Sequence, residues 1–226
     1  RGSVGLGYRS PNAIADNAAY LPSNRIYQYY APLHNATPYY TTLDNAQLAQ
    51  EHSMNTGLST VFYIPIGKRE LQLSGEYYYT KFLNGVIADM DRSVHSITLY
   101  NMHDVDGAKY FSHNWQVEAT MEILRGWTMT AAFRYTDVKQ TTFNSAVGKY
   151  QLRDKPLQNK FKGIITTSYQ TPLKTWQFDL TAQFNGAGRM PDGFAIPEGS
   201  NQYFTDENGQ VHHKWYCQLL GQITKI

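Results

Sequence analysis

The chain has 226 residues, enough for one large domain or two small ones, and its net charge of +2 is too small to favour nucleic-acid binding. It contains one cysteine, Cys217, which excludes an internal disulfide framework. Aromatic residues make up 14% of the chain, and tyrosine is the commonest of them. Tyrosine has an apolar ring and a polar tip, so this composition suits a surface that is partly apolar and partly wet.

Alternating hydrophobic and polar residues predict eight long strands. In 115–123 the apolar residues Trp115, Val117, Ala119, Met121 and Ile123 alternate with polar ones, and the same pattern recurs in 127–135 and 176–184. Because successive side chains of a strand point to opposite faces, each segment has one apolar and one polar face. In chain order, the predicted strands lie near 2–9, 54–64, 69–82, 111–124, 127–138, 157–170, 175–186 and 213–225.

The apolar rows have the length of a membrane-spanning strand. Each of the three rows runs nine residues, and a tilted transmembrane strand needs roughly 9–11. Aromatic residues lie near both ends of the rows, as expected at two lipid–water boundaries. None of the three rows contains Asp, Glu, Lys or Arg. Seven charged residues of the predicted strands lie on the opposite parity, where they would face a polar lumen: Glu76, Glu118, Glu122, Arg134, Lys160, Lys162 and Asp179.

Connections between the predicted strands alternate in length. Short turns are expected at 65–68, 125–126 and 171–174, and long connections at 10–53, 83–110, 139–156 and 187–212. This asymmetry is typical of outer-membrane barrels, which have tight periplasmic turns and long extracellular loops. We therefore predict an all-β, antiparallel transmembrane β-barrel, with residues 1–226 forming a single barrel segment.

Two other interpretations share part of this pattern. A soluble β-sandwich acting as a binding module also alternates, although its core would place bulky residues in the middle of each strand. A free-standing small barrel acting as an anchor or adhesin would have eight strands. The long connections argue against the small barrel, because loops above about 12–15 residues are usually functional. The chain also begins directly in strand alternation, so we expect a processed product or a fragment.

Several stretches resemble one protein family across nearly the whole chain. Gly5-Leu6-Gly7-Tyr8-Arg9-Ser10-Pro11-Asn12 looks like a strand and loop of TonB-dependent outer-membrane receptors. Segments 132–139, 176–181 and 186–191 are similar to the Bacteroidetes branch of that family. The turn at Gly107-Ala108-Lys109 departs from the family pattern through the inserted residues 103–106.

The resemblance implies a 22-stranded barrel, of which this chain would supply about eight strands. It also implies an N-terminal plug domain, absent from this chain, through which an inner-membrane TonB complex would act. Companion chains could complete the barrel. The implied activity is uptake of a scarce nutrient of the siderophore-iron, haem or cobalamin class, in the outer membrane of a Gram-negative bacterium.

Candidate binding residues lie in the predicted extracellular loops. Tyrosines crowd the first long loop, where they could pack the loop on itself or stack on a planar ligand. Three arginines near the predicted extracellular rim, Arg9, Arg153 and Arg189, could bind an anionic metal chelate or lipid phosphates. The candidate ligand-binding residues are Arg9, Tyr29, Tyr30, Tyr39, Tyr40, Arg189 and Tyr203.

Metal binding and catalysis have weaker support in the sequence. Close groups of His and Asp could bind a metal, at His103, Asp104 and Asp106, at His212 and His213, and at Asp89 with Asp91. Solvated loop residues are the simpler interpretation of each group. The sequence contains no G-x-S-x-G, H-E-x-x-H or phosphate-binding loop motif. We therefore expect neither an enzyme nor a bound cofactor.

Overall fold

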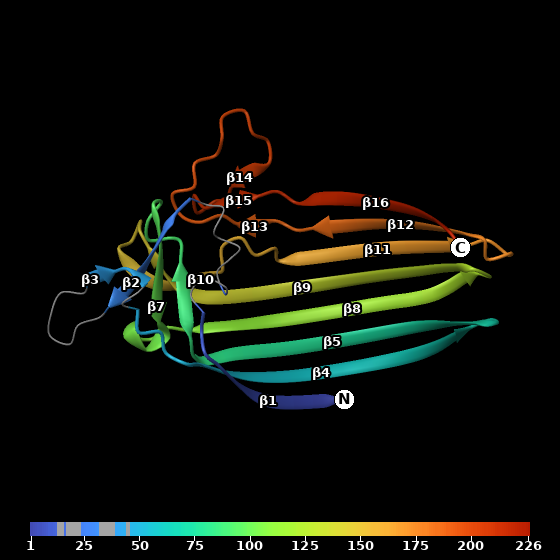
Figure 1. Cartoon of the computed structure of the whole chain (residues 1–226), viewed down its shortest axis with the longest axis horizontal. Coiled ribbons are helices and arrows are strands. Elements are labelled where there is room, and N and C mark those ends of the chain that lie inside the picture. Colours follow the sequence, from blue (N-terminus) through green and yellow to red (C-terminus); the bar gives the residue numbers. More distant parts are fainter. Residues whose placement is uncertain (13–15, 17–23, 32–38, 44–45) are drawn as a thin grey trace.

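The chain is all-β, and its largest element is an antiparallel sheet of nine strands (Figure 1). The computed structural model describes residues 1–12, 16, 24–31, 39–43 and 46–226. The strands of the sheet follow the order β1-β4-β5-β8-β9-β11-β12-β16, and β10 pairs with the outer end of β9. Their bounds are β1 Gly2–Arg9, β4 Glu51–Ile66, β5 Arg69–Asn84, β8 Tyr110–Leu124, β9 Trp127–Asn144, β10 Lys149–Asp154, β11 Phe161–Gln170, β12 Trp176–Asn185 and β16 Tyr216–Lys225.

All eight long strands that the sequence predicts are present, within four residues at each end except that β9 continues six residues beyond its predicted end. The short turns gather at one end of the sheet and the long connections at the other, which we call the turn end and the loop end (Figure 1). Glycines with positive φ form two of the turns, Gly67 (φ 64°) and Gly126 (φ 79°). A Cβ on Gly126 would lie 2.6 Å from the carbonyl oxygen of Gln170, so this turn has space only for glycine.

The long connections contain strands that the alternation pattern did not predict. A four-stranded sheet, the cap sheet, has the order β3-β2-β7-β6. Its strands are β2 Ile26–Ala31, β3 Tyr39–Thr41, β6 Val86–Asp89 and β7 Ser96–Asn101, and a 3-10 turn follows at Met102–Asp104. A three-stranded sheet has the order β13-β15-β14, with β13 Gly188–Arg189, β14 Tyr203–Thr205 and β15 Val211–His213.

The register of the large sheet brings every apolar row to the same face. Across β4, β5, β8, β9 and β11, neighbours pair directly in the row Leu58, Tyr77, Trp115, Tyr135 and Phe161. Near the turn end, Trp127, Tyr169, Phe178 and Ile223 pair in the same way across β9, β11, β12 and β16. Since side chains alternate along each strand, this pairing creates one apolar face and one polar face across the sheet.

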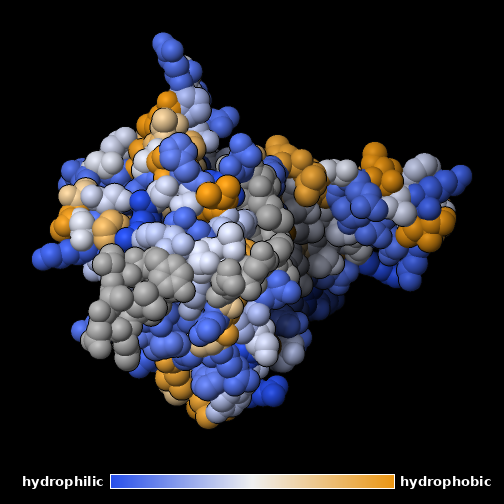
Figure 2. All heavy atoms as spheres, turned by 60° about the vertical axis from the view of Figure 1, so that its left-hand side comes forward, coloured by the Kyte–Doolittle hydropathy of each residue, from blue (hydrophilic) through white to orange (hydrophobic). Residues whose placement is uncertain are grey.

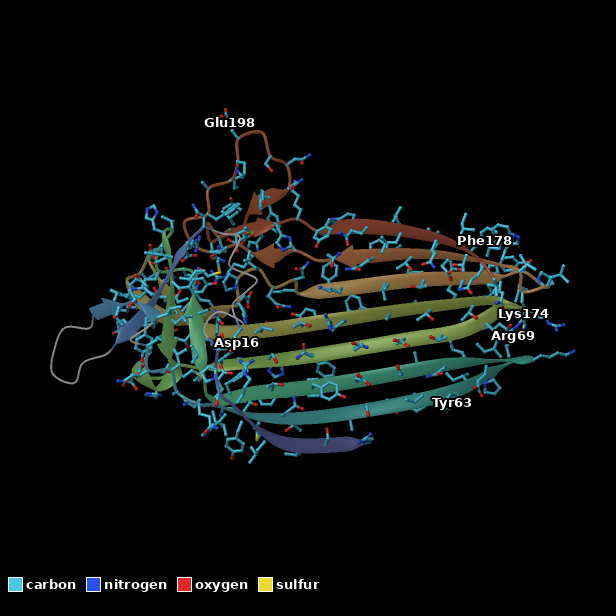
Figure 3. All side chains as sticks on the ribbon, in the orientation of Figure 1. Asp16, Tyr63, Arg69, Lys174, Phe178 and Glu198 are labelled. Carbon is cyan, nitrogen blue, oxygen red and sulfur yellow. The ribbon has the colours of Figure 1, made fainter. Side chains whose placement is uncertain are left out.

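The apolar face is exposed in its middle. Val117 is 51% exposed and Leu180 52%, so no described residue covers this part of the sheet. Charged side chains instead mark the two ends, with Arg69 and Lys174 at the turn end and Asp16 and Glu198 at the loop end (Figure 3). A soluble sandwich would bury this face under a second sheet, and the described residues form no such layer.

The buried core lies at the loop end. One cluster combines Tyr29, Met90, Ile97 and Leu99, and a second combines Ile87, Tyr100, Met102 and Val105. Strand β7 is buried at all six positions, the polar Ser96, Thr98 and Asn101 included. With the loop end turned forward, the surface is mostly hydrophilic, with scattered apolar patches (Figure 2).

Within the described residues the sheet does not close into a barrel. β1 and β16 lie at its two edges and do not pair with each other. The prediction of an all-β antiparallel fold is therefore confirmed, whereas a closed barrel is not formed by this chain alone. Two open edges leave rows of backbone N–H and C=O groups without partners in the sheet. No helix in the described part of the chain is long and apolar enough to cross a membrane.

Candidate functional site at the loop end

The cap sheet packs against the polar face of the large sheet. Phe82 of β5 and Tyr110 of β8 share that face, and their rings stack with centroids 4.2 Å apart against the second core cluster. The Gln140 side chain donates a hydrogen bond to the carbonyl of Ala88, and the Thr142 hydroxyl donates to Asp91 at 2.8 Å. The 83–110 connection thus folds over the polar face at the loop end.

The cap sheet and the segment 90–95 that joins β6 to β7 together form the cap. A buried ion network fixes the cap to its neighbours. Asp91 is fully buried and accepts two hydrogen bonds from the Arg189 guanidinium, at 2.6 and 3.0 Å. Arg189, 5% exposed, also donates to the carbonyl of Asp154. Arg153 makes a two-pronged pair with Asp192, at 2.6 and 2.8 Å. The network therefore joins the cap, through Asp91, to the β9–β10 hairpin and to the 187–212 connection.

Asp89 is the second buried carboxyl of the cap. It accepts hydrogen bonds from the backbone N–H of Phe143 (2.7 Å) and of Asp91 (2.8 Å). Burial raises the pKa of Asp89 to about 6, because removal from water disfavours the charged form and the two N–H donors offset only part of this effect. The pKa of Asp89 thus lies close enough to neutrality for the cap to respond to pH.

A cleft of about 600 Å³ opens between the β9–β10 hairpin and the 187–212 connection. We call it the Arg153 cleft. Its walls carry the paired charges of the network, one histidine and a few apolar side chains, among them Arg153, Arg189, Asp192, Gln210, His212 and Leu152. Its volume falls within the range usual for small-molecule sites, roughly 300–1,000 Å³.

The tyrosines predicted to bind a ligand in the first long connection do not form one cluster. Tyr29 is buried, and its hydroxyl donates to the carbonyl of Gln47 at 3.1 Å. The rings of Tyr30 and Tyr40 lie 5.8 Å apart, and the guanidinium of Arg92 lies over both, at 5.7 and 5.1 Å from their centroids. These contacts show packing of the loop on itself. The side chain of Tyr39 lies outside the described residues.

The remaining predicted ligand-binding residues occupy separate places. Arg9 pairs with Glu51 (2.5 Å) and Asp16 (2.8 Å), close to the cap but outside the Arg153 cleft. Tyr203 lines a second hollow of about 800 Å³ with Trp215 and Tyr216. Arg189 lies in the Arg153 cleft, together with the rim arginine Arg153 and the metal candidate His212. The structure also brings Tyr30 and Tyr40 together beside Arg92.

The predicted metal-binding groups form pairs only. His103 contacts Asp104 at 3.2 Å, and His212 contacts Asp206 at 3.1 Å. His213 instead contacts the carbonyl of its neighbour Lys214, and Asp106 is exposed. Nowhere in the described part of the chain do three or more His, Cys, Asp or Glu side chains gather as metal ligands.

Much of this site depends on contacts that the sequence did not predict. Asp91, Asp192 and Arg92 each contact segments that are 39 or more positions away, so their partners cannot be inferred from spacing. The sequence singled out Asp89 and Asp91 only as a close pair of possible metal ligands, and Asp192 lies in a long connection, where polar residues are common. No protein family profile matches the chain, and no curated protein or solved structure shows significant similarity to it.

Proposed function

We propose that this chain is a wall segment of an outer-membrane β-barrel, with its apolar face against lipid and its polar face toward an aqueous lumen. The observation that carries the proposal is the apolar face itself. Eight strands contribute to it in register, it is exposed in the middle, and it contains no charged residue between its aromatic bands. An uncovered apolar surface of this extent marks contact with lipid or with another protein.

Two aromatic bands cross the apolar face and support lipid as the contact: an outer band near the loop end and an inner band near the turn end. In the outer band the ring centroids of Tyr77 and Trp115 lie 4.1 Å apart. In the inner band the indole N–H of Trp127 donates a hydrogen bond to the hydroxyl of Thr167. On β9 the two bands are marked by Tyr135 and Trp127, eight residues apart, or about 27 Å along the strand at roughly 3.4 Å per residue. The apolar band of an outer-membrane barrel is about 25 Å tall, and strand tilt shortens the projected distance further.

The two open edges support a larger barrel. In lipid an unpaired strand edge costs several kcal/mol per unsatisfied backbone group, so β1 and β16 need neighbouring strands. Together with the resemblance to TonB-dependent receptors, this favours a segment of a 22-stranded transporter. The nutrient, of the siderophore-iron, haem or cobalamin class, would bind at the loop end. Energy would come from the TonB complex acting through the plug domain, and the barrel would contribute shape and contacts.

Cell fractionation tests this assignment. The native protein is expected in the outer-membrane pellet after washing at alkaline pH, and it should require detergent for extraction. Uptake of its nutrient should stop when the proton gradient that powers TonB is collapsed. Recovery as a detergent-free soluble protein would contradict the membrane assignment. Recovery in the membrane without any uptake that depends on the protein would favour an anchor or adhesin.

A further inference from the structure

A hollow lies in the apolar face over β11, β12 and β16, toward the turn end. Its volume is about 480 Å³, and it opens beside Gly221 of β16, whose register partner is Leu180. The lining residues that belong to the apolar face are Thr167, Tyr169, Phe178, Leu180, Gly221 and Ile223. Figure 3 shows Phe178 close to the turn end.

The fold itself does not require glycine at position 221. The register between β12 and β16 runs without a bulge, and the φ angle of Gly221 is not positive. A Cβ built on Gly221 would meet no described atom within 4 Å, so a side chain would fit there. Glycine weakens the interior of a strand, and apart from bulges and bends it marks places where another molecule approaches closely. The missing side chain thus leaves open a space that the strand pairing does not explain.

Cations gather at the turn end, next to this hollow. Within the described residues, none of them forms an ion pair with a carboxylate. They are Lys68, Arg69, Arg125, Lys174 and Lys225. The carboxylates nearby in the strands, Glu70, Glu122 and Asp179, lie on the parity of the polar face. Unpaired cations at a membrane boundary attract anionic lipid headgroups.

Lys225 joins this cationic end to the hollow. It lies opposite Trp176 in the register, and its ammonium group is 5.9 Å from the centroid of the Trp176 ring. It follows Ile223, which lines the hollow, by two residues, or about 7 Å along the strand. Lysine and tryptophan side chains just beyond an apolar wall lie where headgroups begin. A lipid with an acyl chain in the hollow would therefore have its phosphate near Lys225.

We propose that the hollow and Lys225 bind one anionic glycerophospholipid of the periplasmic leaflet. One acyl chain lies over Gly221, and the phosphate contacts the ammonium group of Lys225. The inference rests on the proposed function, because the apolar face must lie in a membrane for this contact to form. A zwitterionic lipid has the same chains and phosphate, but it adds an ammonium group that Lys225 repels, so the anionic lipid is preferred.

Native mass spectrometry of the full receptor tests the proposal. The receptor is released from nanodiscs with equal amounts of phosphatidylglycerol and phosphatidylethanolamine, and the lipids that stay bound are identified by mass. One lysine at an anionic lipid surface contributes roughly fivefold in affinity, so we expect retained phosphatidylglycerol to exceed phosphatidylethanolamine about fivefold. Equal retention of the two lipids would overturn the proposal. So would the absence of bound lipid, which is the result expected if another protein covers this face.

Lys225→Gln should abolish the preference for phosphatidylglycerol, because it removes the charge beside the hollow. Lys68→Gln is the matched control, since it removes the same charge from the turn between β4 and β5, several strands away. The control should keep the preference. A preference that survives Lys225→Gln, or that both variants lose equally, would contradict the proposal.

Gly221→Phe should fill the hollow and lower the retention of both lipids. Ala131→Phe is its matched control, because Ala131 lies on the same face, on β9, outside the hollow lining. The shift in gel mobility between unheated and heated samples verifies that each variant is folded, and Gly221→Val replaces Gly221→Phe if the larger side chain impairs assembly. Unchanged lipid retention in the folded Gly221 variant would contradict the proposal.

The outcomes also separate this inference from the membrane assignment. A receptor that fractionates with the outer membrane but shows no preference for phosphatidylglycerol would remove the lipid site alone. Recovery as a detergent-free soluble protein would remove both.

Discussion

Leu180→Arg is expected to impair assembly of the protein into the outer membrane. Leu180 lies in the middle of the apolar face, where its register partners are Thr167 and Gly221. An arginine there would face the middle of the bilayer, at a cost of about 2–4 kcal/mol on the lipid side of a barrel strand. The folded fraction in outer membranes, read from the shift in gel mobility between unheated and heated samples, should fall severalfold or more.

Thr181→Arg is the matched control for this substitution. Thr181 is the next residue of β12 and lies on the polar face, where its hydroxyl contacts that of Thr166 at 3.2 Å. The same charge at the same depth would then meet water in the lumen, so assembly should be close to that of the native protein. Equal loss for both variants would show that the two faces do not differ in environment.

The cap is expected to become more stable as the pH falls from 7.5 to 4.5. The pKa of Asp89 is raised from an ordinary value of 3.8 to about 6 by burial. The folded cap therefore binds a proton between these two pH values that the opened cap does not, and opening becomes harder as the pH decreases through 6. Applied to these two pKa values, linkage gives a gain of about 2 kcal/mol over this pH range.

Hydrogen exchange at the Phe143 amide measures this effect directly, because that N–H donates to Asp89. After correction for the intrinsic exchange rate, the free energy of opening should rise with acidification and level off below pH 4. Asp89→Asn keeps an acceptor oxygen and cannot titrate, so its profile should be flat. A free energy of opening that decreases in the native protein as the pH falls from 7.5 to 4.5 would contradict this account. The groups facing Asp89 include Asp91, Arg92 and Arg153, which the substitution leaves in place.

The sequence predicted the large sheet well because its signal is local. Alternation along 115–123 depends only on neighbouring residues, and a two-residue connection such as Arg125-Gly126 determines which strands pair. The shared face of Trp115, Tyr135 and Phe161 followed from the same parity, and the register confirms it. These features need no knowledge of distant contacts.

The loop end could not be predicted in this way because its contacts are distant. β2 and β7 pair in parallel between Ile26 and Ser96, and Arg189 reaches Asp91 across 98 positions. β7 is only six residues long, and its alternation is not that of a half-exposed strand, because its polar side chains are buried as well. Arg189 was identified as a rim residue, but its role in a buried ion pair depends on a partner that nothing in the local sequence indicates.

Accessibility of spin labels to oxygen, which concentrates in lipid, and to a water-soluble nickel complex tests the central claim most directly. Labels would be placed singly at Val117, Ala131 and Leu180 on the apolar face and at Gln116, Thr130 and Thr181 on the polar face, in native protein reconstituted into bilayers with Cys217 replaced by serine. The account predicts that oxygen dominates at the first three positions and nickel at the other three. Nickel access equal on both faces, or shielding of the apolar positions from oxygen, would contradict it.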